Sequence, residues 1–274
     1  MNRKCTLTDI QSQPDNRKLP IDQVGVKDFS FPVTVLDKAN GYQHTVAKVN
    51  MYVSLPHDFR GTHMSRFIEI LNEYSEISTT RIPEILEQMK LRLNAETAYV
   101  DFEFPYFITK TAPVSGAQSV MEYYCSIHGD SSMPHYTISV RVPVLSLCPC
   151  SREISRYGAH NQRSYVIITI RTRRKIYFED LIEIAEKSAS SGLYSLMKRE
   201  DEKYVTEHSY ENPVFVEDLV RQVALCLREI PGVEGFSVES DNMESIHNHS
   251  AYARITHNFD GFCEPAPAVD SHLP

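Results

Sequence analysis

The chain has 274 residues, of which 42% are hydrophobic and 23% are charged, and its formal net charge is −8 at pH 7. This length can bury a large core in one domain or in two small ones. The acidic balance argues against a general nucleic-acid binder, because such proteins carry a basic excess. No apolar run reaches the roughly 20 residues that cross a bilayer, and the N-terminus lacks a signal-peptide core. We therefore expect a cytoplasmic protein with neither a nucleic-acid nor a membrane partner.

The first half of the chain predicts strands, then two helices, then strands again. Residues 1–24 are polar and are expected to form a flexible N-terminal arm. Apolar periodicity then predicts helices at 62–74, with Thr62 as N-cap, and at 78–93, where Pro83 fits only the first turn. The predicted strands of this half are 29–35, 45–55, 97–107 and 121–128.

The second half repeats this order of elements. Helices are predicted at 178–196, with a break near 190–192, and at 214–230, where one apolar face is clearest. The predicted strands are 135–145, 164–171, 233–239 and 250–257. Each half therefore predicts strand, strand, helix, helix, strand, strand.

This duplication predicts an α+β protein with two ββααββ modules and antiparallel sheets. The first module is expected at 25–130 and the second at 131–260, followed by a C-terminal tail at 261–274. Two separate four-stranded sheets leave edges open, and open edges favour pairing with other chains. We therefore expect a symmetric homo-oligomer.

A cysteine pair is the most informative motif of the chain. The segment Ser146-Leu-Cys-Pro-Cys-Ser151 holds two thiols around one proline, and His160 follows Cys148 by twelve residues. A scattered set of six cysteines forms no disulfide framework, so the pair with its histidine suggests metal ligation or thiol chemistry. The alternative is that both thiols are small buried hydrophobic groups, and for an isolated pair the two interpretations are about equal.

Three other segments carry polar residues. The run Asp201-Glu-Lys-Tyr-Val-Thr-Glu207 has a simple alternative interpretation as a solvated charged loop. Glu217 begins a helix, where it complements the helix dipole and has Arg221 four residues later as a possible partner. Glu244 and His247 lie three residues apart before the last strand, although isolated histidines are more often structural than ligands.

Together these segments supply thiolate, imidazole and carboxylate groups. This mixture suits a borderline divalent ion such as Zn²⁺, Fe²⁺ or Mn²⁺. An open coordination position would activate a water molecule, and a nearby Glu/His pair would move protons. The residues alone thus predict a metal-assisted hydrolase or lyase without a named substrate.

Six motifs, in order, resemble those of the prokaryotic GTP cyclohydrolase IB family of the tunnelling-fold superfamily. They are Pro56-His-Asp-Phe-Arg-Gly-Thr-His-Met-Ser-Arg-Phe67, Lys110-Thr-Ala-Pro-Val-Ser-Gly116, Ser146-Leu-Cys-Pro-Cys-Ser151, Gly158-Ala-His-Asn-Gln-Arg-Ser164, Asp201-Glu-Lys-Tyr-Val-Thr-Glu207 and Asn242-Met-Glu-Ser-Ile-His-Asn-His249. The resemblance implies a tunnelling fold (T-fold) whose two ββααββ modules assemble into a homotetramer with active sites at subunit interfaces. It also implies conversion of GTP and water to 7,8-dihydroneopterin triphosphate and formate, which feeds folate synthesis and, in bacteria, the queuosine pathway.

The resemblance further implies roles for individual residues. A divalent ion, zinc, manganese or iron, is expected on Cys148, His160 and Glu202. The implied catalytic residues are Cys148, Cys150, Glu244 and His247, with Cys150 either catalytic or regulatory.

Substrate recognition is implied for a second set of residues. Glu217 resembles the carboxylate that anchors the guanine edge, and such a group accepts two parallel hydrogen bonds from N–H donors. His63, Arg66 and Lys110 are expected at the triphosphate from their charge and their place in the motifs.

Two rival interpretations remain at this point. A nitrile reductase of the same superfamily would use a cysteine nucleophile and a nicotinamide cofactor, which leaves His160, Glu202 and Glu244 without a purpose. A non-catalytic redox sensor switching through Cys148 and Cys150 explains the thiols and none of the other motifs.

Overall fold

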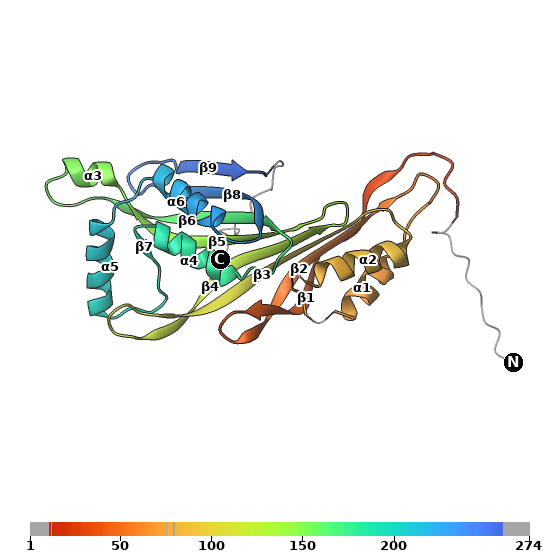
Figure 1. The fold of residues 1–274 in the computed structure, drawn as a ribbon, viewed down its shortest axis with the longest axis horizontal. Coiled ribbons are helices and arrows are strands. Elements are labelled where there is room, and N and C mark those ends of the chain that lie inside the picture. Colours follow the sequence, from red (N-terminus) through yellow and green to blue (C-terminus); the bar gives the residue numbers. More distant parts are fainter. Residues whose placement is uncertain (1–10, 12, 75, 79, 260–274) are drawn as a thin grey trace.

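The strands form a single antiparallel sheet that runs through the whole molecule (Figure 1). The computed structural model describes residues 11, 13–74, 76–78 and 80–259. Neighbouring strands lie in the order β1-β2-β3-β4-β5-β6-β8-β9, and the short β7 pairs with β5. The strands are β1 (Ile21–Asp37), β2 (Gly41–Leu55), β3 (Ala98–Thr111), β4 (Gln118–Asp130), β5 (Tyr136–Leu147), β6 (Asn161–Thr172), β7 (Ser191–Gly192), β8 (Val233–Asn242) and β9 (Ala251–His257).

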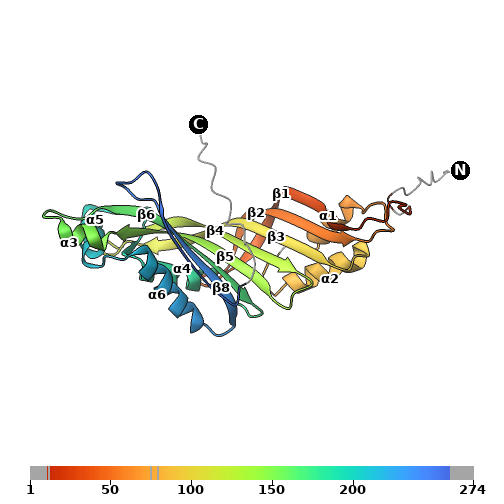
Figure 2. The same cartoon turned by 90° about the horizontal axis from the view of Figure 1, so that it is seen from above.

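Helices pack on one face of this sheet, and Figure 2 shows α2, α4 and α6 on the same side. The strands alternate between buried and partly exposed residues, which fits a sheet that is covered on one face. In the same way α6 buries Leu219, Val223 and Leu227 along one stripe against β8. The helices are α1 (Met64–Asn72), α2 (Ile82–Leu93), α3 (Pro149–Ile154), α4 (Phe178–Ser188), α5 (Arg199–Glu211) and α6 (Val216–Arg228).

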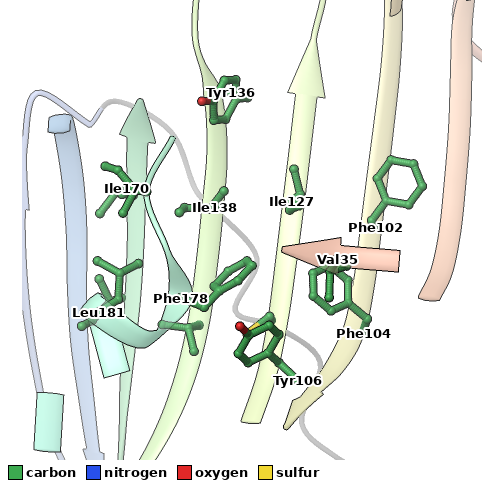
Figure 3. Packing of buried hydrophobic residues seen from close by; sticks show 14 of the residues in the cluster. Val35, Phe102, Phe104, Tyr106, Ile127, Tyr136, Ile138, Ile170, Phe178 and Leu181 are labelled. Carbon is green, nitrogen blue, oxygen red and sulfur yellow. The ribbon is translucent and has the colours of Figure 1, made fainter. Parts of the chain in front are cut away.

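Both halves of the chain contribute to one continuous core (Figure 3). Phe178, the first residue of α4, packs edge-to-face on Phe104 of β3 with ring centroids 5.8 Å apart. The same ring lies 5.5 Å from that of Tyr106, whose hydroxyl donates to Glu179 Oε1 over 2.6 Å. Residues 178–179 of the second half are thus held by β3 of the first half.

The halves join where β4 pairs with β5, and this pairing ends abruptly. The ladder runs from Gly129↔Tyr136 to Tyr124↔Arg141 and goes no further. Beyond that point β5 pairs with β7 instead, at Val144↔Gly192 and Leu145↔Ser191. The sheet therefore splits between β4 and β5, with β7 and the residues after it beside the split.

The predicted fold class, a tunnelling fold of two ββααββ modules, is wrong. The nine strands belong to one sheet, and the inner edges of the two halves are paired with each other through β4 and β5. The second half also contains α3, α5 and β7, which the ββααββ order lacks. The homotetramer expected with that fold rested on open module edges and is withdrawn with it.

The predicted strands and helices are present, but the ends of several elements differ. The structure also contains two helices, α3 and α5, that were not predicted. The helix predicted at 178–196 ends at Ser188, and the predicted break at 190–192 is the site of β7. The run 201–207, whose simple interpretation was a loop, lies in α5. The N-cap of α1 is His63 rather than Thr62, without a side-chain capping hydrogen bond.

The two ends of the chain lie largely outside the residues that the structure describes. Residues 1–10 and 12 of the predicted N-terminal arm and all of the predicted tail, 261–274, lie outside the described residues, while the end of the arm belongs to β1. Among the described residues, no helix has the length and apolarity needed to span a bilayer.

Shared packing predicts that the two halves unfold together. Phe178→Ala removes a buried ring that bridges them and should cost about 3–5 kcal/mol of unfolding free energy. Leu225→Ala, at a side chain that is 56% exposed, should change stability by less than about 0.5 kcal/mol. Denaturant unfolding followed by far-UV and near-UV circular dichroism should show one shared transition for both variants. Two separate transitions would instead support residues 25–130 and 131–260 as independent units.

Candidate active site

Three strands end at the same place and bring together residues that are far apart in sequence. The β5–β6 ladder closes with the pair Leu147↔Asn161, so Cys148 and His160 are the first residues beyond it. The backbone N–H of Cys148 donates to the carbonyl oxygen of His160 over 3.1 Å. Glu244 arrives from β8, because Asn242 pairs with Ser164 of β6 and ends that strand beside them.

Cys148 caps the short helix α3. Its backbone is extended, with φ −70° and ψ 116°, and its Sγ accepts a hydrogen bond from the Ser151 N–H over 3.4 Å. The Ser151 hydroxyl donates to the Cys148 carbonyl and accepts from the His160 N–H, each over 3.2 Å. Pro149 follows directly in the first helical position, which needs no N–H donor. The thiol is therefore half-buried and held at a fixed place beside His160.

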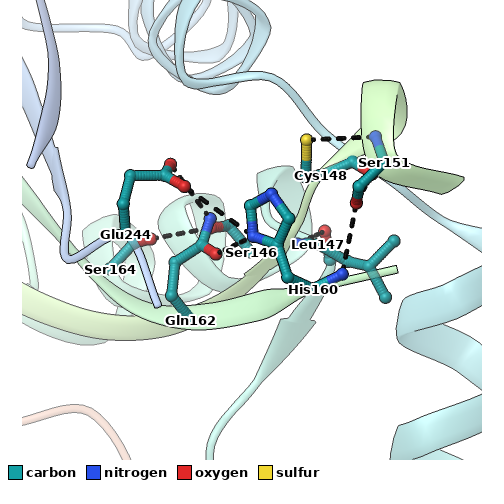
Figure 4. Close-up of polar contacts among 9 residues, drawn as sticks. Ser146, Leu147, Cys148, Ser151, His160, Gln162, Ser164 and Glu244 are labelled. Carbon is teal, nitrogen blue, oxygen red and sulfur yellow. Dashed lines mark hydrogen bonds and ion pairs between the residues drawn. The ribbon is translucent and has the colours of Figure 1, made fainter. Parts of the chain in front are cut away.

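A chain of polar side chains supports His160 from the other side (Figure 4). His160 Nδ1 lies 3.0 Å from Gln162 Oε1 and 3.7 Å from Glu244 Oε2. Gln162 Nε2 donates to Ser146 Oγ over 2.9 Å and to Glu244 Oε1 over 3.3 Å. In Figure 4 the imidazole lies between Glu244 and Cys148, with its second nitrogen on the side of the thiol.

The direction of these hydrogen bonds fixes the state of the imidazole. A carboxylate only accepts, so the Gln162 amide must turn its NH₂ group to Glu244 and its oxygen to His160. The Nδ1 atom of His160 then has to carry a proton to donate to that oxygen. In the neutral ring this leaves the Nε2 lone pair free on the side of Cys148. The arrangement is the one that metal-ligating histidines use.

Helix α5 is anchored by a buried carboxylate in its first turn. Asp201 accepts hydrogen bonds from four donors: the N–H groups of Val114, Ser115 and Lys198 and the Ser115 hydroxyl, at 2.6–2.9 Å. Burial by itself raises the pKa of Asp201, but the hydrogen bonds from Ser115, Lys198 and Val114 outweigh it and hold the pKa well below its usual range. The motif at 110–116 thus holds the first turn of α5, the helix that carries Glu202, through hydrogen bonds to Asp201.

The carboxylates expected at the site differ in position. Glu202 is exposed in the first turn of α5, beside β5 and β7, and Glu217 is exposed in the first turn of α6. The segment before α6 is tied to the site because the Val214 N–H donates to the Leu147 carbonyl over 3.2 Å. Over residues 11, 13–74, 76–78 and 80–259, no three His, Cys, Asp or Glu side chains form a metal-holding group. Cys148, His160 and Glu202 are therefore not gathered into one cluster.

Comparison with known proteins identifies the family. A family model described as type I GTP cyclohydrolase folE2 matches residues 7–253. The chain belongs to this family. It is a GTP cyclohydrolase, as the motifs predicted, and the two rival interpretations, a nitrile reductase and a redox sensor, are set aside. The family prediction is confirmed at the level of a type I GTP cyclohydrolase. The family whose model matches is folE2.

Curated relatives match over nearly their whole length. The GTP cyclohydrolase FolE2 of Pelobacter propionicus is 55% identical over 251 residues, which cover 91% of this chain and 98% of the relative. That of Thiobacillus denitrificans is 52% identical over 265 residues, covering 94% and 98%.

A solved structure has a similar overall fold at low sequence identity. A hyperthermostable urate oxidase mutant from Bacillus sp. TB-90 aligns with a TM-score of 0.50 and 11% identity, over 86% of this chain and 98% of that one. At this identity the likeness concerns the fold alone. It agrees with a single antiparallel sheet and adds to the correction of the predicted fold class.

The other predicted site residues of this folE2 cyclohydrolase take up different positions in the fold. Cys150 is exposed on α3, and His247 is exposed in the loop after β8, where its ring stacks on His249 with centroids 5.0 Å apart. His63 and Arg66 lie at α1, in the half of the molecule away from α3 and α5 (Figure 1). Of these two, Arg66 donates to the Arg92 carbonyl at the end of α2 over 2.9 Å.

Lys110 is already engaged within the protein. Its Nζ donates to Glu186 Oε1 over 2.7 Å and to the Leu193 carbonyl over 2.6 Å, and lies 4.5 Å above the Tyr194 ring. The Tyr123 hydroxyl donates to the same Glu186 oxygen over 2.8 Å. The lysine charge is thus neutralised in a largely buried ion pair.

Sequence reasoning missed the residues that hold the predicted ligand His160 in place. Gln162, Ser146 and Ser164 are buried polar residues in strands, with the two serine hydroxyls 2.9 Å apart. A signal existed, because residues two apart in a strand share a face, which places Gln162 beside His160. Asp201 was noted only as part of a charged run, although Asp and Glu residues are enriched in the first turn of helices.

The Asp201 anchor predicts a pH-dependent helix. A depressed pKa means that the ionised form contributes stability at neutral pH, and that this contribution is lost as pH falls below about 4. Asp201→Asn should lower the Tm at pH 7, and its difference from wild type should shrink below that pH. Glu200→Gln, an exposed neighbour in the same turn, is the matched control and should melt like wild type. Equal melting of Asp201→Asn and wild type at pH 7 would contradict the anchor.

Proposed function

We propose that this GTP cyclohydrolase carries out its reaction at the end of β5, β6 and β8, with a divalent ion held by Cys148 and His160. The observation that carries the proposal is the hydrogen bonding of His160, whose Nδ1 faces Gln162 Oε1 and whose second ring nitrogen lies on the side of Cys148. Its Nδ1 is committed as a donor to Gln162, so its Nε2 is left as a lone-pair ligand beside the Cys148 thiol. A thiolate and an imidazole together suit zinc, manganese or iron.

A carboxylate completes the proposed ligand set. Glu202 is the ligand that the family resemblance implies, and it lies on α5 at the same end of the molecule. Its helix is fixed by Asp201, while the Glu202 side chain itself is exposed and able to swing. Glu244 is the nearer carboxylate, with Oε2 3.7 Å from His160 Nδ1, and its place on the Nδ1 side suits proton transfer better than ligation.

The residues around the proposed ion have separate roles in water activation, proton transfer and positioning. A divalent ion bound there would supply Lewis acidity and would lower the pKa of a bound water toward about 7 in the best cases. Glu244 is placed to move a proton, because it is largely buried and hydrogen-bonded to Gln162. His247 is the second candidate for a proton donor to the imidazole nitrogen that leaves when C8 of guanine is released as formate. Gln162 positions His160 and orients Glu244.

Glu217 is proposed as the guanine anchor. The expected competing pair with Arg221 does not form, because Arg221 donates to Asp218 Oδ1 over 2.9 Å. In the part of the chain that the structure describes, the Glu217 carboxylate has no hydrogen bond or ion pair. It is exposed and available for two parallel hydrogen bonds from the guanine edge.

Two further predictions concern the triphosphate contacts and the location of the protein. His63, Arg66 and Lys110 stay proposed triphosphate contacts, and the internal partners of Arg66 and Lys110 compete with that role. A cytoplasmic location stays a prediction that fits GTP as the substrate.

Cys148→Ala tests the proposed ion site. Loss of the thiolate should abolish formate release and lower the bound metal, measured by elemental analysis of protein purified without oxidation. Cys150→Ala is the matched control on the same helix and should retain the metal. Full metal occupancy with wild-type turnover in Cys148→Ala would refute the assignment.

Glu217→Gln tests guanine recognition. Losing one acceptor of a paired set should lower kcat/KM for GTP by roughly 10⁴-fold, while metal content and Tm stay near wild type. The neighbouring Asp218→Asn breaks the ion pair with Arg221 and should change stability by at most about 0.5 kcal/mol without affecting GTP. A Glu217→Gln protein that melts early and turns over GTP normally would make the residue structural.

A further inference from the structure

A pocket of about 560 Å³ opens where the sheet splits between β4 and β5. Its size is typical of small-molecule sites. Residues from three strands and from the segment after β7 form its walls. Those used below are Glu122, Tyr124, Arg141, Arg163, Tyr165 and Tyr194.

Two arginines in this pocket lack anionic partners. Arg141 stacks on Tyr165, with its guanidinium carbon 3.9 Å from the ring centre, and its Nε is buried without a hydrogen-bond partner. Arg163 makes no side-chain hydrogen bond or ion pair within the described ranges 13–74, 76–78 and 80–259. A buried unsatisfied N–H on a charged group is costly and points to a missing acceptor.

The charge balance of the pocket is positive. Glu122 is its acidic residue, and neither arginine forms an ion pair with it. Lys110 lies above the Tyr194 ring at the edge of the pocket, but Glu186 neutralises it. Two guanidinium groups and one carboxylate therefore face this space, which leaves it with a net positive charge.

This pocket faces away from the candidate active site. Gln162 and Ser164 of β6 are buried on the face that supports His160. Arg163 and Tyr165 alternate with them along the strand and so point to the opposite face. The two sites share β6 but are separated by the sheet.

We propose that this pocket binds a phosphate-bearing ligand. Guanidinium groups present fixed N–H forks that match phosphate oxygens, and they are less hydrated than ammonium groups. The acceptor that the Arg141 Nε lacks would be a phosphate oxygen, and the tyrosines offer ring faces to a planar group on the same ligand. The ligand is either the triphosphate of GTP itself or a separate phosphate compound, and the two differ in their effect on kinetics.

Titration of the full-length, metal-loaded enzyme with inorganic tripolyphosphate tests the site. We expect calorimetry to show binding that weakens as salt rises, and Arg163→Gln to weaken it by about tenfold or more. Arg141→Gln should act in the same direction. Arg228→Gln, an exposed arginine outside the pocket, should bind like wild type. No binding to wild type, or equal binding in all variants, overturns the proposal.

Steady-state kinetics then distinguish the two sources of phosphate. If the site holds the GTP triphosphate, tripolyphosphate competes with GTP and Arg163→Gln raises KM for GTP while kcat changes little. If it holds a separate ligand, tripolyphosphate binds without competing and KM for GTP stays the same in Arg163→Gln. The binding readout needs no turnover, so it is independent of the roles proposed for Cys148 and Glu217.

Discussion

The closing rung of the β5–β6 ladder is the constraint on which the site depends. Leu147 and Asn161 form the last pair, and the Cys148 N–H bonded to the His160 carbonyl continues it for one more residue. The loop between them spans residues 149–159, yet its ends are fixed by backbone hydrogen bonds. A thiol and an imidazole are therefore neighbours irrespective of the conformation of that loop. Strand β8 brings Glu244 to the same place, because its last pair with β6, Asn242↔Ser164, lies next to Gln162.

The direction of the hydrogen bonds around His160 then determines which ring nitrogen faces the thiol. Glu244 accepts from the Gln162 amide, the amide oxygen faces Nδ1 of His160, and the free lone pair is left on the thiol side. Breaking any member of this chain would allow the imidazole to rotate or change tautomer. The burial of Ser146 and Ser164 keeps the amide from turning, because the Ser146 hydroxyl holds its NH₂ group. Gln162 is thus as necessary to the arrangement as the ligands that the sequence predicted.

Local pattern and long-range pairing were not equally predictable. The alternation in 45–55 and the apolar stripe of 214–230 depend on neighbouring residues, and both elements are found close to their predicted limits. The pairing of β4 with β5 depends on contacts between two halves that carry no mark of it in sequence, so two sheets were expected where there is one. Helix α5 has almost no apolar stripe and is held by Asp201 instead, which explains why 201–207 had the pattern of a loop. The spacing of Cys148 and His160 suggested metal ligation or thiol chemistry, while Gln162 between the motif residues gave no separate signal.

The alternation of β6 connects the two proposed sites of this enzyme. Gln162 and Ser164 point to the covered face and serve the imidazole, while Arg163 and Tyr165 between them point to the split in the sheet. A one-residue change of register in this strand would exchange the two sets and destroy both at once. The register is fixed on both sides, by twelve pairs with β5 and by the ladder with β8. The same ladders that bring Cys148, His160 and Glu244 together therefore also place the unpaired arginines beneath them, on the other side of one strand.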